Sequence, residues 1–308
     1  DKKNQGISEK TWKKVKKIAK KYNYEGNNKR RRLDKRKFIF FMEEFSYNEN
    51  VAGRLLDGFN DYDLKSHQFV FFFNQLINNK NNINKIIDEF NPDGIIIATS
   101  YTKKIDINFK NIKINKILLN CYNDSFTGLT ILPDDYNGSK NAVSYLIENN
   151  FKKIPIILSS DTWMKGYKDR LSGWRDAHLE HNLKYDDNFI LIPKDNSENA
   201  GYSQTIKLLK SLKDVDAIFC TSDEIAMGAY QALKEKGINI PDDISIIGYD
   251  NSNLSNLVKP KLSSVQLPYS EMTQKAINHI IDRQKFNDNF IITIDSPLIK
   301  KESVRKKK

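Results

Sequence analysis

From residue 38 onward, short apolar runs alternate with longer stretches in which apolar positions recur at helical spacing. The short runs predict buried strands, namely FIFFM at 38, FVFFF at 69, GIIIA at 94, KILLN at 116, IPIIL at 154, FILI at 189, DAIFC at 216 and ISIIG at 244. The amphipathic stretches between them predict helices over residues 50–62, 82–90, 137–149, 164–182, 198–213 and 223–236. Apolar strands that alternate with helices are typical of parallel sheets covered on both faces, so the pattern predicts the α/β class.

Polar side chains follow these strands at the point where each strand ends. They are Glu43, Glu44, Ser100, Tyr101, Asn120, Ser159, Ser160, Ser222, Asp223, Asp250 and Asn251. Ligands of parallel sheets bind outside the carboxyl ends of the strands. The polar ends fall in two runs along the chain, which predicts two similar sheets that face each other across a cleft. Carboxylates, amides and hydroxyls in a cleft suit a small polar ligand such as a sugar.

The first 38 residues differ from the rest in charge. They hold 16 Lys and Arg against 4 Asp and Glu, a net charge of +12, whereas the remaining residues hold 34 against 35, a net charge of −1. A helix is predicted to start at Ser8 and Glu9, with an apolar stripe made of Trp12, Val15, Ile18, Ala19 and Tyr22. A basic arm on a near-neutral body is typical of a protein that binds a polyanion, and a solvated, disordered tail is the alternative.

The signatures of common enzymes and cofactor sites are missing from the sequence. There is no G-x-G-x-x-G or G-x-x-x-x-G-K-[ST] loop and no G-x-S-x-G motif, so we expect neither a cofactor nor an enzyme. His178 and His181 lie three residues apart on a predicted helix, where a solvated face is favoured over a metal site because no third ligand is near. The adjacent Asp134 and Asp135 are interpreted as the cap of the helix that follows.

Cysteine content and hydropathy predict the cellular compartment of the protein. Cys121 and Cys220 are far apart and form neither a disulfide framework nor a zinc pattern, which favours a reducing compartment. No apolar run reaches the roughly 18 residues that a membrane span needs, and no signal peptide opens the chain. We therefore expect a cytoplasmic protein. The first residue is Asp1, so the sequence may also be a fragment of a longer chain.

Six blocks of the sequence carry a resemblance to a known family. They are ISEKTWKKVKKIAKKYNYEGNNKRRRL, DDYNGSKNAVSYLIENNFKKIPII, YKDRLSGWRDAHLEHNL, TSDEIAMGAYQALKEKGINIPDDISIIGYDN, KPKLSSVQLPYSEM and PLIKKESV. In this order they are similar to blocks of the lactose-repressor type (LacI/GalR) of bacterial transcription regulators. The resemblance implies two periplasmic-binding-protein-like subdomains of parallel sheet flanked by helices, joined by three crossovers, with an effector in the cleft. It also implies a homodimer and an amino-terminal helix-turn-helix that binds operator DNA.

The resemblance also implies a division of the chain. Residues 1–37 match the third headpiece helix and the hinge helix, a helical remnant of the DNA-binding headpiece, whose helix-turn-helix would lie before Ser8. The amino-terminal subdomain would comprise 38–135 with 268–294, and the carboxyl-terminal subdomain 136–267 with 295–308. The hinge residues expected to contact DNA are Asn27, Arg30, Arg31, Arg32 and Leu33.

The residues expected to bind the effector are Arg170, Asp250, Asn120, Ser222, Asp223 and Glu44. Arg170 and Asp250 keep the family's pattern. Arg170 is expected to be the main polar anchor, since a guanidinium matches vicinal hydroxyls or a carboxylate. The chain departs from the pattern at Ser222, where the family often has Asn, and at Leu267, where it often has Gln, so a hexose is not implied.

Together these observations predict an effector-responsive transcription regulator, a repressor, whose ligand is a small polar molecule such as a sugar. The alternative is the solute-binding component of a sugar transporter, which has the same two-lobed body. Such a protein would have no use for a basic helix and a hinge, so the arm favours the regulator.

Overall fold

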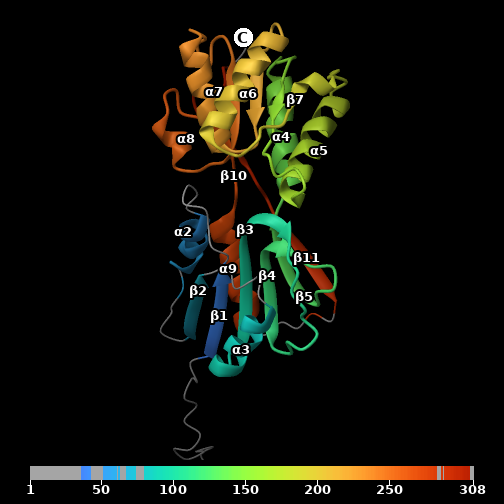
Figure 1. Ribbon diagram of the computed structural model, residues 1–308, viewed down its shortest axis with the longest axis vertical. Helices are drawn as coiled ribbons and strands as arrows, with labels where there is room; N and C mark the ends of the chain where they lie inside the picture. The colour runs from blue at the N-terminus through green and yellow to red at the C-terminus, as the bar shows by residue number, and fades with distance from the viewer. Residues whose placement is uncertain are drawn as a thin grey trace, which may run out of the picture.

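The computed structural model describes residues 36–42, 51–60, 62, 67–73, 80–282, 286 and 288–305. The described chain forms two lobes that lie end to end along the longest axis of the molecule (Figure 1). Each lobe is built around one six-stranded sheet. The predicted headpiece helix and hinge lie outside the described residues, and so does the segment that directly follows the first strand.

Sheet A has the strand order β11-β5-β4-β3-β1-β2, and its neighbouring strands are parallel. Its strands are β1 (Arg36–Met42), β2 (His67–Phe73), β3 (Gly94–Lys104), β4 (Asn115–Tyr122), β5 (Gly128–Pro133) and β11 (Asn289–Ile294). Cross-strand aromatic pairs join β1 to β2. They are Phe38–Phe69, Phe40–Phe71 and Phe41–Phe72, with ring centroids 5.2, 5.8 and 5.6 Å apart. Such pairs stabilise the register of neighbouring strands.

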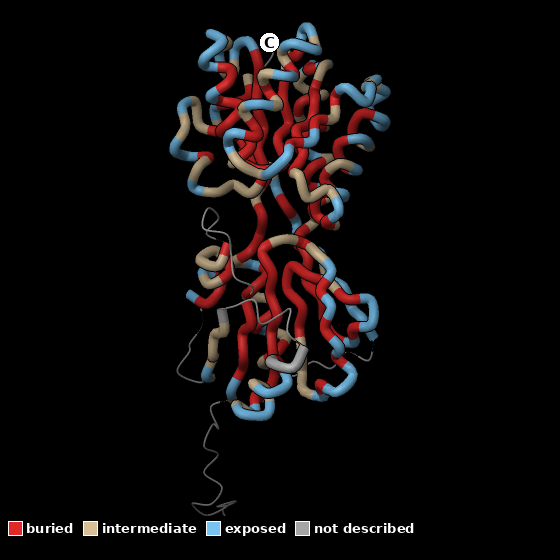
Figure 2. Tube along the Cα trace, in the orientation of Figure 1, coloured by how far each residue is buried: buried red, intermediate tan, exposed pale blue. Residues whose placement is uncertain are grey.

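Sheet B has the order β12-β10-β9-β8-β6-β7 and is parallel except at β12, which runs antiparallel to β10. Its strands are β6 (Ile156–Ile157), β7 (Ile190–Leu191), β8 (Ala217–Cys220), β9 (Ser245–Asp250), β10 (Ser263–Gln266) and β12 (Leu298–Ile299). Figure 2 shows the inner strands of both lobes as buried, while exposed residues gather on the outer helices and loops and on the edge strand β11. Each sheet is therefore the core of its lobe.

Helices flank both sheets, as the alternating pattern predicts. Those of the first lobe are α2 (Val51–Leu56), η2 (Asp57–Phe59), α3 (Lys80–Phe90) and α9 (Tyr269–Ile281). Those of the second lobe are α4 (Asp135–Glu148), α5 (Lys165–Glu180), η4 (Asp187–Phe189), α6 (Glu198–Ser211), α7 (Asp223–Glu235) and α8 (Leu254–Leu257). Helix α4 packs against α5, and α6 packs against α7. None of the described helices combines the length and the apolar character needed to cross a membrane.

The chain passes between the lobes three times: from β5 to α4, from β10 to α9, and from β11 to β12 (Figure 1). Two parallel-sheet lobes with flanking helices and three crossovers confirm the predicted fold class. The exact subdomain limits stay a prediction. Arg36 and Lys37, which the sequence assigned to the arm, are the first residues of β1.

Candidate functional site

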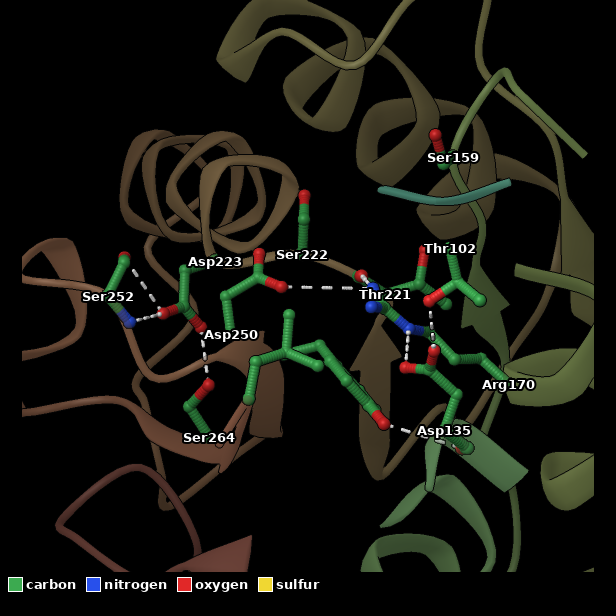
Figure 3. A network of polar contacts seen from close by, with 12 residues as sticks. Thr102, Asp135, Ser159, Arg170, Thr221, Ser222, Asp223, Asp250, Ser252 and Ser264 are labelled. Atoms are coloured by element: carbon green, nitrogen blue, oxygen red, sulfur yellow. Dashed lines mark hydrogen bonds and ion pairs between the residues drawn. The ribbon is translucent and has the colours of Figure 1, made fainter. Parts of the chain in front are cut away.

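Residues at or near the carboxyl ends of central strands of both sheets line one region between the lobes, and Figure 3 shows the network of polar side chains there. The polar residues that lie there are Ser100 and Thr102 of β3, Asn120 of β4, Arg170 of α5, Thr221 after β8 and Asp250 of β9. The structure thus brings together three residues that the sequence predicted for the site, Asn120, Arg170 and Asp250. Carboxyl ends of parallel strands that face each other make the cleft that the two runs of polar strand ends predicted.

Arg170 lies at the centre of this region and is only 6% exposed. Its Nε donates a hydrogen bond to Asp135 Oδ1 at 2.8 Å, and its Nη1 donates to the carbonyl oxygen of Thr221 at 2.6 Å. Asp250 Oδ1 lies 3.8 Å from Nη1, and the ring centroid of Tyr249 lies 3.8 Å from Cζ. Burial opposes the charge of the guanidinium, but Asp135, then Tyr249 and Asp250, raise the pKa of Arg170 well above its ordinary value. The residue is therefore a charged, internally bonded group.

Asp135 was missed as a site residue. The interpretation of Asp134 and Asp135 as a helix cap holds for Asp134, whose side chain accepts a hydrogen bond from the Asn137 N–H at 3.0 Å. It is wrong for Asp135, which is 1% exposed and forms the ion pair with Arg170. A buried arginine requires a buried anionic partner. Nothing in the local sequence indicates which aspartate that partner is, because the two residues are 35 positions apart.

Asp250 ends β9 in a left-handed backbone conformation with φ of 102°, and the next residue, Asn251, has φ of 46°. Aspartate and asparagine tolerate this region better than most residues, which suits them to a sharp turn after a strand. The turn leaves the Asp250 side chain 18% exposed at the cleft. Among the predicted effector-binding residues that the structure describes, Asp250 is the most exposed.

Asn120 also has a positive φ, 57°, and is buried. Its amide nitrogen donates to the Thr99 carbonyl oxygen at 3.0 Å, and its Oδ1 accepts from Thr102 Oγ1 at 2.7 Å. Thr102 Oγ1 also lies 3.4 Å from Asp135 Oδ2, which links the first lobe to the Arg170 network. Both the nitrogen and the oxygen of the Asn120 side-chain amide are therefore hydrogen-bonded within the protein.

Ser222 and Asp223 have separate roles at the start of α7. Ser222 is the cap, since its side chain accepts a hydrogen bond from the Ile225 N–H. Asp223 is buried and accepts hydrogen bonds from the N–H and the hydroxyl of Ser252 and from the hydroxyl of Ser264 (Figure 3). Burial raises the pKa of the Asp223 carboxyl to about 6, although these hydrogen bonds act in the opposite direction. Asp223 therefore holds the segment that follows Asp250.

The free space in the cleft is divided unequally. Around Arg170, where Tyr101, Thr102, Gly166 and Tyr167 approach each other, a volume of only about 10 Å³ is open. A second compartment of about 450 Å³ lies between α2 and η2 on one side and the segment from Asp250 to α8 on the other. Both spaces are lined by Asp250 and Tyr269. Of these two spaces, the second is the one with room for a ligand of ordinary size.

The remaining predicted residues do not belong to this arrangement. Glu44 and the hinge residues Asn27, Arg30, Arg31, Arg32 and Leu33 lie outside the described residues. Ser159 and Ser160 both bond to the side chain of Asn196, which closes a separate network after β6.

The histidines differ from their prediction in part. His178 is buried against Trp174 and Tyr185, so a solvated face is wrong for this residue, whereas His181 is exposed. Burial lowers the pKa of His178. Among the described residues, no group of three or more histidines, cysteines or carboxylates is placed to hold a metal ion.

Comparison with known proteins gives the chain its family. The sequence model of the periplasmic binding protein-like domain matches residues 143–304, a little over half of the chain. The HTH-type transcriptional repressor PurR of Actinobacillus pleuropneumoniae serotype 3 is 34% identical over 198 residues, which are 63% of this chain and 58% of that protein. The probable HTH-type transcriptional repressor ExuR of Bacillus subtilis is 32% identical over 187 residues, 59% of this chain and 54% of that protein. The chain thus matches little more than half the length of these relatives.

A solved structure extends the similarity over most of the chain. The LacI family transcriptional regulator from Enterococcus faecium, solved with bound ribose, superimposes with a TM-score of 0.71 at 25% identity, covering 88% of this chain and 100% of that one. Because 88% of this chain is aligned, the similarity extends over both lobes. The chain belongs to the periplasmic binding protein-like domain family and, within it, to the LacI/GalR type.

Proposed function

We propose that this chain is the effector-binding body of a DNA-binding transcription regulator, a repressor, whose effector is a small polar molecule of the sugar class. The observation that carries the proposal is the cleft: two sheets present their polar strand ends to each other, and Asp250 lies where the enclosed space opens into a compartment of about 450 Å³. A space of this size with carboxylates, amides, a serine hydroxyl and a tyrosine on its walls suits a polyhydroxylated ligand. The repressor names of the relatives and the ribose in the structural neighbour support the same class.

The proposed partners of the whole protein are operator DNA, the effector and a second copy of the chain, in the cytoplasm. The arm of net charge +12 is the proposed DNA-contacting part, with residues 38–135 and 268–294 as one subdomain and 136–267 and 295–308 as the other. Catalysis is not part of the proposal. If the arm contacts phosphates, DNA binding should fall steeply as the salt concentration rises, because released counterions drive it.

The alternative function is solute binding for a sugar transporter, which the family description and the two-lobed body also fit. The basic arm is the feature that separates the two functions. Titration of a DNA duplex with the protein, with and without sugar at two salt concentrations, decides between them. A solute-binding protein would bind the sugar and leave the DNA signal unchanged.

Effector binding is tested by a thermal-shift screen of the protein against ribose, glucose, galactose and cellobiose. A ligand that binds the folded state raises the melting temperature by mass action, so at least one sugar should raise it. Asp250→Asn and Asp250→Ala should each weaken that effect, while Asp187→Asn, which alters an exposed aspartate of η4, should not. No stabilisation by any sugar, or full stabilisation of both Asp250 variants, would overturn the proposed site.

A further inference from the structure

Strand β11 is one edge of sheet A and lies at the margin of the first lobe opposite to β2 (Figure 1). An edge strand carries a row of backbone N–H and C=O groups that its own sheet does not pair. The edge strands of sheet B, β7 and β12, have two residues each, whereas β11 has six. β11 therefore offers a longer row of such groups than either edge of the second lobe.

The side chains of β11 are apolar and largely exposed. Phe290 is 53% exposed and Ile291 is 52% exposed, although both lie within a strand. They point to opposite faces of the sheet, because successive side chains of a strand alternate. Proteins usually protect an exposed edge with charged residues or proline, and the sequence of β11, NFIITI, contains neither. Exposed apolar side chains on an unprotected edge indicate a binding surface.

The hydrogen bonds to β5 show which residues of β11 face outward. The N–H of Gly128 donates to the Asp288 carbonyl oxygen at 3.1 Å, and the N–H of Asp134 donates to the Ile294 carbonyl oxygen at 2.8 Å. The register of this parallel pair is continuous along the whole of β11. Alternate residues of a strand bond to the same neighbour, so the even-numbered residues of β11 face β5. The residues whose N–H and C=O groups point away from the sheet are therefore Asn289, Ile291 and Thr293.

The outward residues are self-complementary. Ile291 lies midway between Asn289 and Thr293, so a second β11 can run antiparallel to the first about a two-fold axis at Ile291. Asn289 then faces Thr293 of the second copy, and Ile291 faces its own equivalent. Residues that face each other in this way exchange both of their backbone hydrogen bonds. A contact of this symmetry closes by itself and gives a dimer rather than a fibre.

The side chains fit the same arrangement. Phe290 lies opposite Ile292 of the second copy, in the closer kind of pair whose residues exchange no backbone hydrogen bonds. An aromatic and a β-branched side chain in such a pair stabilise each other. Phe286 stacks on Phe290 with ring centroids 5.5 Å apart, which holds the ring against its own lobe. On the other face Ile291 is covered by its equivalent, so both exposed apolar side chains leave the solvent.

The charged residues nearest to β11 lie just outside its two ends, at Asp288 and Asp295. Antiparallel pairing brings Asp288 of one copy near Asp295 of the other, and salt should screen this repulsion because both residues are exposed. The basic arm is a different occupant that these aspartates would attract. Its apolar positions, however, recur at helical spacing rather than at the two-residue spacing of a strand, so it matches the edge less well.

We propose that β11 is an interaction surface for a second copy of this chain, which pairs antiparallel about Ile291 and extends sheet A across both copies. The inference goes beyond the proposed function, since it concerns a surface outside the cleft, and it is independent of any other surface through which copies associate. With six residues on each side the contact is small, so the dissociation constant should be on the order of 10–100 µM.

Sedimentation velocity tests the association, from about tenfold below that dissociation constant to about tenfold above it. Ile291→Pro removes an outward N–H and no bond to β5, and proline is tolerated at such positions of an edge strand. Ile291→Lys places a charge at the centre of the contact. Both variants should weaken the association at least about tenfold. Leu179→Lys, which alters a 62% exposed leucine of α5 in the other lobe, is the matched control and should change it less than about twofold.

Disulfide formation tests the register. Facing residues of an antiparallel pair have Cα atoms about 4.5 or 5.5 Å apart, and a disulfide spans both distances. Ile291→Cys should therefore form a linked dimer under mild oxidation. An equimolar mixture of Phe290→Cys and Ile292→Cys should form the mixed dimer, identified by its mass, in preference to either homodimer. The unaltered protein, whose two cysteines are buried, gives the background.

Three results would overturn the inference, and none of them touches the proposed effector site. One is association that is equal in the unaltered protein and both Ile291 variants, or absent from the unaltered protein at the highest concentration. Another is a homodimer of Phe290→Cys in place of the mixed dimer, which would exclude the register. The third is association that weakens as salt rises, which would assign the edge to the basic arm, because salt screens the attraction of the arm for Asp288 and Asp295.

Discussion

Where α5 meets the first lobe, which we call the α5 side of the cleft, Arg170 and Asp135 form a buried ion pair. In the compartment of about 450 Å³ between α2 and α8, which we call the α2–α8 compartment, Arg54 and Asp57 lie three residues apart without pairing with each other. Arg170 is 6% exposed and its carboxylate partner Asp135 is 2.8 Å away. Arg54 is half-buried and donates to the Leu267 carbonyl oxygen, and the exposed Asp57 accepts a long hydrogen bond of 3.5 Å from Asn60 Nδ2. The same residue types thus pair in a dry environment on one side and stay apart, partly in water, on the other.

Solvation explains the difference. A charge taken out of water requires compensation from an opposite charge and from hydrogen bonds. A ligand that binds to such a charge must replace those partners, so the net gain in affinity is small. A charge that stays partly in water loses little when a ligand replaces that water. The pairing of a polar group, rather than its identity or its place in the sequence, therefore indicates whether it binds a ligand.

The largest expected effect comes from breaking the buried pair. Arg170→Ala leaves the Asp135 carboxylate in a dry site, so we expect it to lower the free energy of unfolding by about 3–5 kcal/mol. Urea denaturation at neutral pH measures the change, with Arg175→Ala as an exposed control on the same helix, expected within about 0.5 kcal/mol. A loss below about 1 kcal/mol for Arg170→Ala would show that the pair does not hold the α5 side together.

A smaller effect is expected from separating the lobes at their contact. The Cβ atom of Gly166→Ala would meet Asp135 and Thr102, so we expect a loss of about 1–3 kcal/mol and a wider α5 side. Small-angle scattering of the free protein should show a larger radius of gyration than for Asn253→Ala, which alters an exposed residue beside the α2–α8 compartment. An unchanged profile and stability would contradict tight contact at Gly166.

The carboxyl of Asp223 should make the segment after Asp250 sensitive to pH. Burial raises the pKa of this carboxyl in the folded state to about 6, above the ordinary value of 3.8. At pH values between 3.8 and 6 the folded protein therefore keeps a proton on Asp223 that the unfolded chain releases. Its contribution to the free energy of unfolding is therefore full below pH 4 and is lost as the pH rises through 6. Relative to Asp223→Asn, the unaltered protein should lose on the order of 1–2 kcal/mol between pH 4.5 and 7. Parallel pH profiles for the two proteins would exclude this proton linkage.

Apolar runs were sufficient to predict most strands but not all. Strand β10 carries Ser263 and Ser264 between β12 and β9 of sheet B. The Ser263 hydroxyl accepts from the N–H of Lys301, and the Ser264 hydroxyl donates to Asp223, and both partners are distant in sequence. Such a strand has no hydrophobic signal because its side chains are satisfied by tertiary partners. Helix α9 differs, since Met272, Ala276 and Ile280 repeat at helical spacing and could have been found.

The site was predictable where it depends on strand ends and unpredictable where it depends on pairing. Asp250 lies at the cleft, as the polar end of ISIIGYD indicated. Arg170 as the main anchor stays a prediction, and its buried partner Asp135 could not be identified from spacing. Arg54 had no motif around it, because its position on the wall of the compartment depends on how the two lobes are joined.

The smallest effects should come from the α2–α8 compartment itself. Arg54→Ala removes one hydrogen bond and a cation–π contact at a half-exposed position, so we expect a loss of about 1 kcal/mol in the free energy of unfolding. Asp57→Asn, at an exposed carboxylate, should stay within about 0.5 kcal/mol of the unaltered protein. Urea denaturation of both variants beside Arg170→Ala gives the measurement. A loss at Arg54 as large as that at Arg170 would contradict the comparison, because a guanidinium that stays partly in water should contribute less to stability than one in a buried ion pair.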